Sequence, residues 1–371
     1  MIYLDSAATS LLKPPEVGEA MLQALSACAS PGRGVHAPAM AAADIAYACR
    51  EEAAALFHMR EPEKVTFTMN TTHGLNIAIR SVVKPGMRVV VSGYEHNAVM
   101  RPLYALGAAV YVVQTPNFDS ENLIDRFRDA VPGSGAVICT HVSNVFGYKL
   151  PMEEIAAICR ESNVPLIIDA AQSAGVYDID FTALEAEFIA MPGHKGLLGP
   201  QGTGLLLCNH SAEPLLYGGT GSMSASPQMP EDFPDRLEAG TQNICGVAGL
   251  LAGIRYIRAH GLEVLRCREE KLSSILADGL SKMEKLYVPL PEKANRAGVI
   301  SVIPREMSCE ELTARLGEAG VAVRPGLQCA PLAHKTAGTF DTGTVRFSLS
   351  PFNTEEEVIR ALEITEKNLK I

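Results

Sequence analysis

Short apolar runs alternate with amphipathic stretches through the middle of the chain. The runs have the length and composition of buried strands, and they occupy residues 64–68, 88–92, 109–113, 136–142, 165–169, 188–191 and 204–208. Helical patterns separate several of them, over residues 73–83, after Asn97 and over residues 152–162. Strands that alternate with helices are typical of a mainly parallel sheet covered on both faces. The pattern therefore predicts an α/β fold.

The two ends of the chain have different patterns. An extended arm over residues 1–15 precedes expected helices at 16–26 and 39–57, the second with Arg50 and Glu52 facing solvent. After a helical stretch from about residue 247 towards 285, the order is strand 298–303, helix 309–317, strand 321–323, a loop over 324–332, strand 344–349 and helix 354–369. We expect a large domain over residues 16–250 and a smaller α+β domain over residues 251–371 that includes the arm. The loop at 217–230 is rich in Gly, Ser, Pro and Met, and we expect it to be functional or mobile.

Composition narrows the class of protein. The chain has 371 residues, 47% of them hydrophobic, and a net charge of −10, which argues against nucleic acid as a partner. It contains no apolar run long enough to span a membrane, and its first ten residues do not have the pattern of a signal peptide. The nine cysteines form no CxxC pair and no metal-type cluster. We expect a cytoplasmic protein with free thiols and no metal site.

Polar residues that can carry chemistry follow the predicted strands. Ligands of open α/β sheets bind at the carboxyl ends of the strands. The polar residues at those positions are Thr71, Thr72, His96, Asn144, Asp169, Gln172, His194 and Lys195. The pattern predicts that these side chains surround one binding site.

Several of these residues together are typical of a pyridoxal phosphate pocket. Lys195 lies in a Gly- and Pro-rich loop behind a strand, where a desolvated amine can form a Schiff base with an aldehyde cofactor; the alternative is a lysine that points into water. Asp169 ends an apolar strand and could pair with a pyridinium nitrogen or cap the next helix. Thr71 and Thr72 could bind a phosphate or cap their helix. His96 could stack on the cofactor ring or fill the core.

Two residues of the C-terminal part invite a functional interpretation. Cys329 differs from the other cysteines because it lies in a Pro/Gly loop near Arg324 and not in an apolar run. A thiol with cationic neighbours can act as a nucleophile, although an incidental loop cysteine is the alternative. Arg346 could clamp a substrate carboxylate with two hydrogen bonds, or form an ordinary surface ion pair.

The sequence resembles the class V aminotransferase-like enzymes of fold type I, and within them the group II cysteine desulfurases and selenocysteine lyases. The motifs that carry the resemblance span nearly the whole chain: residues 3–9, 32–36, 70–76, 95–97, 141–147, 169–172, 193–195, 238–243, 324–329 and 346–353. The resemblance implies a large domain with a mainly parallel seven-stranded sheet and a smaller α+β C-terminal domain.

The resemblance also implies how pyridoxal 5'-phosphate is held. Lys195 binds its aldehyde and later acts as general base, Asp169 pairs with the pyridine nitrogen, and Gln172 pairs with the phenolic oxygen. His96 stacks on the ring and belongs, with Lys195 and Cys329, to the catalytic residues. The phosphate is expected to be bound by Thr71, Thr72, His194 and, from the partner subunit of a homodimer, Thr241.

The implied substrate is L-cysteine or L-selenocysteine. Asn144 and Arg346 would hold its carboxylate, with Arg324 beside them. Cys329 would take the sulfur as a persulfide and leave L-alanine, and a sulfur-acceptor protein, such as one that serves iron–sulfur cluster assembly, would receive the sulfur. The short loop that ends at Cys329 is similar to that of group II enzymes.

The sequence departs from the family pattern at two site positions. Pro192 stands where a serine is common, which removes one phosphate-binding hydroxyl, and Gln328 stands where a histidine is common. The alternatives to a cysteine desulfurase are a selenocysteine lyase, a transaminase or kynureninase-like lyase, and a sulfur-transfer scaffold without a cofactor.

Overall fold

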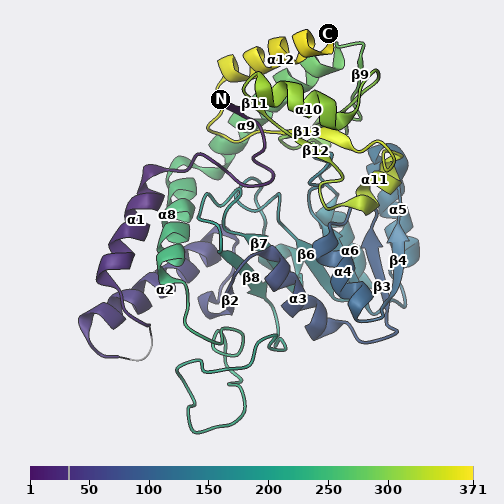
Figure 1. Cartoon of the computed structure of the whole chain (residues 1–371). Helices are drawn as coiled ribbons and strands as arrows, with labels where there is room; N and C mark the ends of the chain where they lie inside the picture. The colour runs from purple at the N-terminus through teal and green to yellow at the C-terminus, as the bar shows by residue number, and fades with distance from the viewer. Residues whose placement is uncertain (32–33, 371) are drawn as a thin grey trace.

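The large part of the molecule is built on one twisted sheet. The structure, a computed structural model, describes residues 1–31 and 34–370, so Gly32 and Arg33 of the motif at 32–36, together with Ile371, lie outside it. The seven strands are ordered β2 (Val65–Thr68), β8 (Gly204–Cys208), β7 (Phe188–Pro192), β6 (Leu166–Asp169), β5 (Ala136–Thr140), β3 (Arg88–Ser92) and β4 (Ala109–Val113). Strand β8 is antiparallel to both of its neighbours, β2 and β7, and the remaining neighbouring strands pair in parallel. The prediction of a mainly parallel seven-stranded sheet is confirmed (Figure 1).

Helices cover both faces of this sheet because its strands are apolar on both sides. In β3, Val89 and Val91 belong to the cluster that contains α3 (Thr71–Val82) and α4 (Asn97–Ala105). Val90, between them, belongs to the opposite cluster. That cluster is covered by α2 (Ala37–Leu56), α5 (Ser120–Ala130), α6 (Met152–Glu161), α7 (Phe181–Leu184) and α8 (Ile244–His260). The alternation follows from the two-residue repeat of a strand.

A smaller lobe lies above the sheet in Figure 1. Its four-stranded sheet has the order β12 (Arg324–Gly326), β13 (Thr344–Ser348), β10 (Val299–Pro304) and β9 (Leu286–Tyr287). Three helices pack with it: α9 (Leu262–Ser281), α10 (Cys309–Glu318) and α12 (Glu355–Leu369). The N-terminal arm joins this lobe, since β1 (Ile2–Tyr3) pairs in parallel with β11 (Val321–Ala322) and Leu4 is part of the lobe's core. The domain boundary at residue 250 stays a prediction.

Three local features differ from the pattern or were missed by it. The helical stretch from 247 to 285 is two helices, because Gly261 has φ +85° and breaks the chain between α8 and α9. The expected loop at 324–332 contains β12 and the start of α11 (Pro331–Ala337). Helix α5 was not predicted, although Leu123 and Phe127 lie one turn apart and are both buried.

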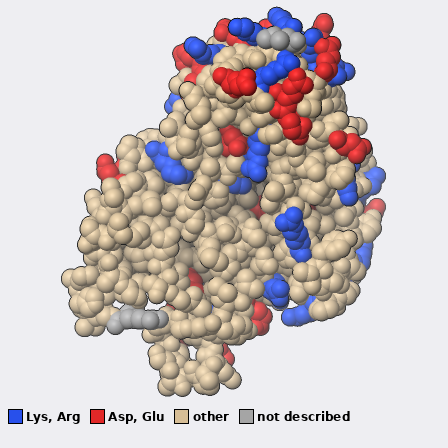
Figure 2. Space-filling model, viewed as in Figure 1, with Lys and Arg blue, Asp and Glu red and all other residues tan. Residues whose placement is uncertain are grey.

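The outer surface shows how charged groups and the peripheral segments are distributed. Within the described ranges, no helix is long and apolar enough to cross a membrane. Helix α1 (Pro15–Ala27) packs against α8, and the segment 217–230 forms a loop at the far end of the molecule from the small lobe (Figure 1). On the face drawn in Figure 2, Lys, Arg, Asp and Glu gather on the small lobe, whereas the lower part carries few charges.

Arg50 is buried, so the prediction that it faces solvent was wrong. Its guanidinium donates to both carboxylate oxygens of Glu238, at 2.8 and 2.7 Å, and lies 4.1 Å from the ring centroid of Phe67. The amide of Phe67 donates to the same carboxylate at 2.7 Å. The pair therefore ties α2 and β2 to the segment that carries Thr241.

Glu238→Gln should destabilise the protein. The substitution leaves the charge of Arg50 buried without a counter-ion, which costs on the order of 3 kcal/mol or more. In urea denaturation, the midpoint should fall while the slope stays unchanged. The control is Glu52→Gln, which removes a more exposed carboxylate paired with Arg255 and Arg258 and should cost about 1 kcal/mol or less. Equal midpoints for the two variants would contradict the assignment.

Candidate active site

The predicted site residues meet in one cavity at the carboxyl ends of the strands. Its volume is about 230 Å³. Every residue predicted for cofactor, substrate or sulfur chemistry lines it except Thr241: Thr71, Thr72, His96, Asn144, Asp169, Gln172, His194, Lys195, Arg324, Cys329 and Arg346. They come from both lobes, so the site is closed by the small lobe on the large one.

Lys195 is held in a tight loop after β7. The amide of Leu198 donates to the Lys195 carbonyl at 3.0 Å, and a Cβ atom at Gly196 would lie 2.3 Å from the carbonyl oxygen of Ala174, so only glycine fits there. The Lys195 amine makes no hydrogen bond or ion pair with any described residue. Burial lowers its pKa to about 8, against the opposing effect of nearby Asp169. A far larger share of this amine is therefore unprotonated near neutral pH than of an ordinary lysine.

Asp169 stands on the strand next to β7. Its side chain is 2% exposed, and one oxygen accepts a hydrogen bond of 2.9 Å from the amide of Ala171. Burial raises the pKa of the carboxyl group, while the charge of Lys195 works in the other direction. A buried carboxylate is stabilised by a cationic partner. A protonated ring nitrogen in the cavity would supply one.

The N-terminus of α3 opens into the cavity. Asn70 is its N-cap, with the side chain accepting from the amide of His73 at 3.0 Å, so the alternative that Thr71 or Thr72 caps the helix is wrong. The amides of Thr71 and Thr72 have no hydrogen-bond partner among the described residues. Free amides at a helix N-terminus attract a phosphate. Pro192 lines the same cavity and offers no hydroxyl.

Both histidines of the cavity are neutral at physiological pH. His96 precedes α4, and its Nδ1 accepts from the amide of Ala98 at 3.0 Å. His194 contacts the hydroxyl of Thr9 at 3.0 Å through Nδ1. Burial, followed by the charge of Lys195, lowers the pKa of each to about 4. A neutral ring can pack against an aromatic cofactor, and a neutral imidazole can donate to a phosphate.

Arg346 spans the gap between the lobes. One nitrogen pairs with Asp5 at 2.7 Å and another donates to the carbonyl of Asn144 at 3.0 Å. Its Nε is buried and has no partner in the described part of the chain. A guanidinium has five N–H donors, so hydrogens remain for a ligand. Arg324 lies directly opposite on the neighbouring strand β12 and is exposed.

The loop that carries Cys329 is fixed by its neighbours. Gln328 and Cys329 have φ of +42° and +58°, a left-handed conformation that costs free energy in non-glycine residues. The side chain of Gln328 is buried and holds this loop: its Nε2 donates to the carbonyls of Arg324 and Thr344, at 3.2 and 3.1 Å. His334 approaches its Oε1 at 3.0 Å. The departure from histidine at 328 is therefore accommodated by a complete hydrogen-bond network, which the sequence alone did not indicate.

Cys329 is exposed and lines the cavity. Cys267 on α9 is exposed as well, but it does not line this cavity. As expected, Cys329 lies in a loop, between β12 and α11, and it shares the cavity with the other predicted site residues, whereas Cys267 does not. Among the residues that the structure describes, no three His, Cys, Asp or Glu side chains form a group that could hold a metal.

Thr241 and Gln172 have surroundings that the sequence did not reveal. Thr241 is exposed and lines a separate cavity with Glu238, so it is not part of its own chain's site. Its role in a partner subunit stays a prediction. The Nε2 of Gln172 donates to the carbonyl of Ala7 at 3.0 Å, which links the site to the N-terminal arm.

Known proteins are similar to this chain over most of their length. The probable cysteine desulfurase of Methanothermobacter thermautotrophicus is 32% identical, over 96% of this chain and 92% of that protein. The probable cysteine desulfurase of Pyrococcus abyssi is 31% identical, over 100% of this chain and 94% of that one. The solved apo structure of the cysteine desulfurase of Thermococcus onnurineus is 31% identical and superposes with a TM-score of 0.91, covering 100% of this chain and 94% of that chain.

A sequence profile of one family extends across both lobes. The profile described as aminotransferase class-V matches residues 2–360. Together with the structural match, it confirms the predicted fold of a large α/β domain with a smaller C-terminal one. The chain belongs to the aminotransferase class-V family.

Proposed function

We propose that this protein is a pyridoxal phosphate-dependent cysteine desulfurase that converts L-cysteine to L-alanine and carries the sulfur as a persulfide on Cys329. One observation supports this above the others: Cys329 and the lysine that would bind the cofactor line the same cavity. The names of the relatives agree with this function.

The residues of the cavity fit the cofactor. Lys195 supplies an unpartnered amine for its aldehyde, Asp169 a buried carboxylate for its ring nitrogen, and the α3 N-terminus free amides for its phosphate. His96 and Gln172 would contact the ring and its phenolic oxygen. When bound, pyridoxal phosphate provides a sink for the electron pair left at the substrate's α-carbon.

The remaining chemistry belongs to side chains of this chain. Arg346 and Asn144 would bind the substrate carboxylate, with Arg324 at the rim. The free amine of Lys195 would take the α-proton as general base. The thiolate of Cys329 would attack the substrate sulfur, so that an S–S bond forms, the C–S bond breaks, and the former sulfur-bearing carbon receives a proton. Cysteine and a thiol thus become alanine and a persulfide.

We also propose a homodimer and a sulfur-acceptor protein as partners. Thr241 supports the dimer because it is exposed and lies outside the site of its own chain. In a homodimer, Thr241 of the partner subunit would bind the cofactor phosphate in this chain's site. The lower part of the face in Figure 2, which carries few charges, and the apolar groove between α1, α2 and α8 are consistent with such contacts. The exposed position of Cys329 would let an acceptor reach the persulfide.

Product analysis tests the function directly. Purified protein loaded with pyridoxal phosphate is expected to form alanine and sulfide in equal amounts from L-cysteine in the presence of a dithiol, which releases sulfur from Cys329. A parallel reaction with L-selenocysteine compares the two substrates. A keto acid product with no sulfide would point instead to a transaminase, and a colourless protein unaffected by borohydride would contradict any cofactor-dependent activity.

A further inference from the structure

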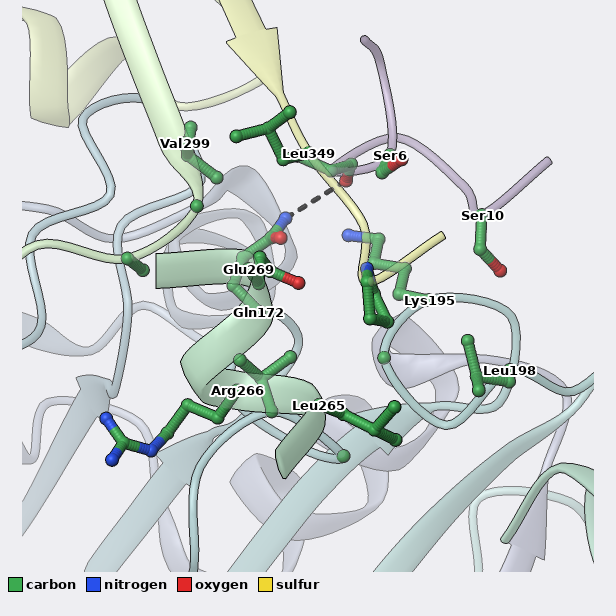
Figure 3. Close-up of a pocket in the computed structure, with 17 residues that line it drawn as sticks. Ser6, Ser10, Gln172, Lys195, Leu198, Leu265, Arg266, Glu269, Val299 and Leu349 are labelled. Carbon is green, nitrogen blue, oxygen red and sulfur yellow. Dashed lines mark hydrogen bonds between the residues drawn. The ribbon is translucent and has the colours of Figure 1, made fainter. Parts of the chain in front are cut away.

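A second, smaller cavity lies behind Lys195. It has a volume of about 50 Å³ and is enclosed by the N-terminal arm, α9 and the start of β10. Lys195 and Gln172 line both this cavity and the larger one, so they form the wall between the two. Figure 3 shows Lys195 on one side of the small cavity and Glu269, from α9, on the other. Of the residues that line this small cavity, the proposed reaction uses only Lys195 and Gln172.

Glu269 is the unusual residue here. It is 9% exposed and forms no hydrogen bond or ion pair with any residue that the structure describes. A Cβ atom at Gly298 would lie 2.3 Å from its Oε1, so the carboxyl group is packed against that backbone. Arg266 lines the same cavity, yet its guanidinium points away in Figure 3 and binds Glu263 and Glu270. The buried acid therefore has no counter-ion.

An unpaired carboxylate in such a place is costly, so the group takes up a proton. Burial, reinforced by the like charge of Glu270, raises the pKa of Glu269 to about 8. Lys195 lines the same cavity, and Tyr177 lies near Glu269, so that the charge of Glu269 adds to the burial that raises the pKa of the Tyr177 phenol. A protonated carboxyl group can donate and accept a hydrogen bond at once. At ~10–15 Å³ per water, the cavity has room for about three to five water molecules.

We propose that Glu269 exchanges protons with Lys195 through water held in this small cavity. The inference rests on the proposed function, in which Lys195 takes the α-proton of the substrate. The ammonium group of Lys195 gives a proton to the adjacent water, which passes one to a carboxyl oxygen of Glu269, while the proton already on Glu269 leaves to water on its outer side. The reverse sequence returns a proton from the outer water to Lys195, so that the ammonium group is exchanged and no net charge accumulates. Glu269 acts through Lys195 and does not touch the substrate.

An isotope experiment measures this exchange. L-cysteine with deuterium at the α-carbon is converted in ordinary water by the cofactor-loaded enzyme, and the deuterium retained in alanine is determined by mass spectrometry. The wild type should lose most of the label, because Lys195 exchanges its proton before returning one. Glu269→Gln, which keeps the shape but cannot relay a proton, should retain severalfold more. A merely structural role would change the rate and leave the retained fraction unaltered.

Two controls complete the test. Glu270→Gln removes one neighbouring carboxylate outside the cavity and should retain label as the wild type does. In the cofactor-free protein, infrared difference spectroscopy should show the carbonyl band of a protonated carboxylic acid that Glu269→Gln lacks. Normal alanine formation with equal label retention in Glu269→Gln and wild type, or no such band, would overturn the proposal. Absence of alanine from the wild type would instead contradict the proposed function.

Discussion

Replacing Cys329 with alanine should abolish desulfuration of L-cysteine while leaving cofactor binding intact. Cys329 supplies a thiol to the large cavity, and among the described residues no second cysteine lines that cavity to replace it. Loss of a nucleophile that forms a covalent intermediate lowers turnover by about 10³-fold or more. Formation of alanine and sulfide from cysteine gives the rate. The absorbance of the loaded protein reports on cofactor binding, which should be unaffected because Cys329 is not among the residues that would hold the cofactor.

Cys267→Ala is the matched control for this variant. Cys267 is the other exposed cysteine, lies on α9 and does not line the cavity, so its removal should leave desulfuration unchanged. Wild-type turnover of cysteine by Cys329→Ala would refute the persulfide role. Full activity of that variant on selenocysteine, with none on cysteine, would support the lyase alternative, because the selenium can leave without a thiol nucleophile.

The fold could be predicted from the sequence where local pattern and burial agree. The strands of the large sheet are short apolar runs, and β3 begins and ends where the pattern placed it, at Arg88 and Ser92. The grouping of Asp169 and Lys195 also followed from topology, since both stand at the carboxyl ends of adjacent parallel strands. In the first case the local pattern of apolar residues decides the structure, and in the second the general arrangement of parallel strands brings the two residues together.

Contacts between distant segments could not be predicted in the same way. Arg50 lies in a charged part of its helix, so the local sequence suggests that it is exposed to solvent. Its counter-ion, Glu238, is 188 positions away along the chain, and the local pattern therefore does not reveal the buried pair. Arg346 meets Asp5 across 341 positions. Glu269 lies in the run of charged residues at 266–271, which is typical of a solvated helix face. Only the fold shows that one of these carboxyl groups turns inward.

Lys195→Ala is expected to have the largest effect on the enzyme, because it removes both the covalent attachment of the cofactor and the general base. Turnover should fall on the order of 10⁴-fold, the upper end of what loss of a general base costs. Unlike Cys329→Ala, this variant should lose activity on cysteine and selenocysteine alike. Borohydride should no longer fix the cofactor to the protein, which peptide mapping after reduction can show.

Lys13→Ala is the control that separates the loss of the Lys195 amine from the loss of any other buried amine. Burial lowers the pKa of Lys13 to about 8 as well, and its amine donates to the hydroxyl of Ser10 at 2.8 Å, but it does not line the large cavity. That variant should keep its activity and its borohydride-fixed cofactor. If Lys195→Ala kept turnover within tenfold of the wild type, or if reduction labelled a different lysine in the wild type, then Lys195 could not be the amine at the reacting centre.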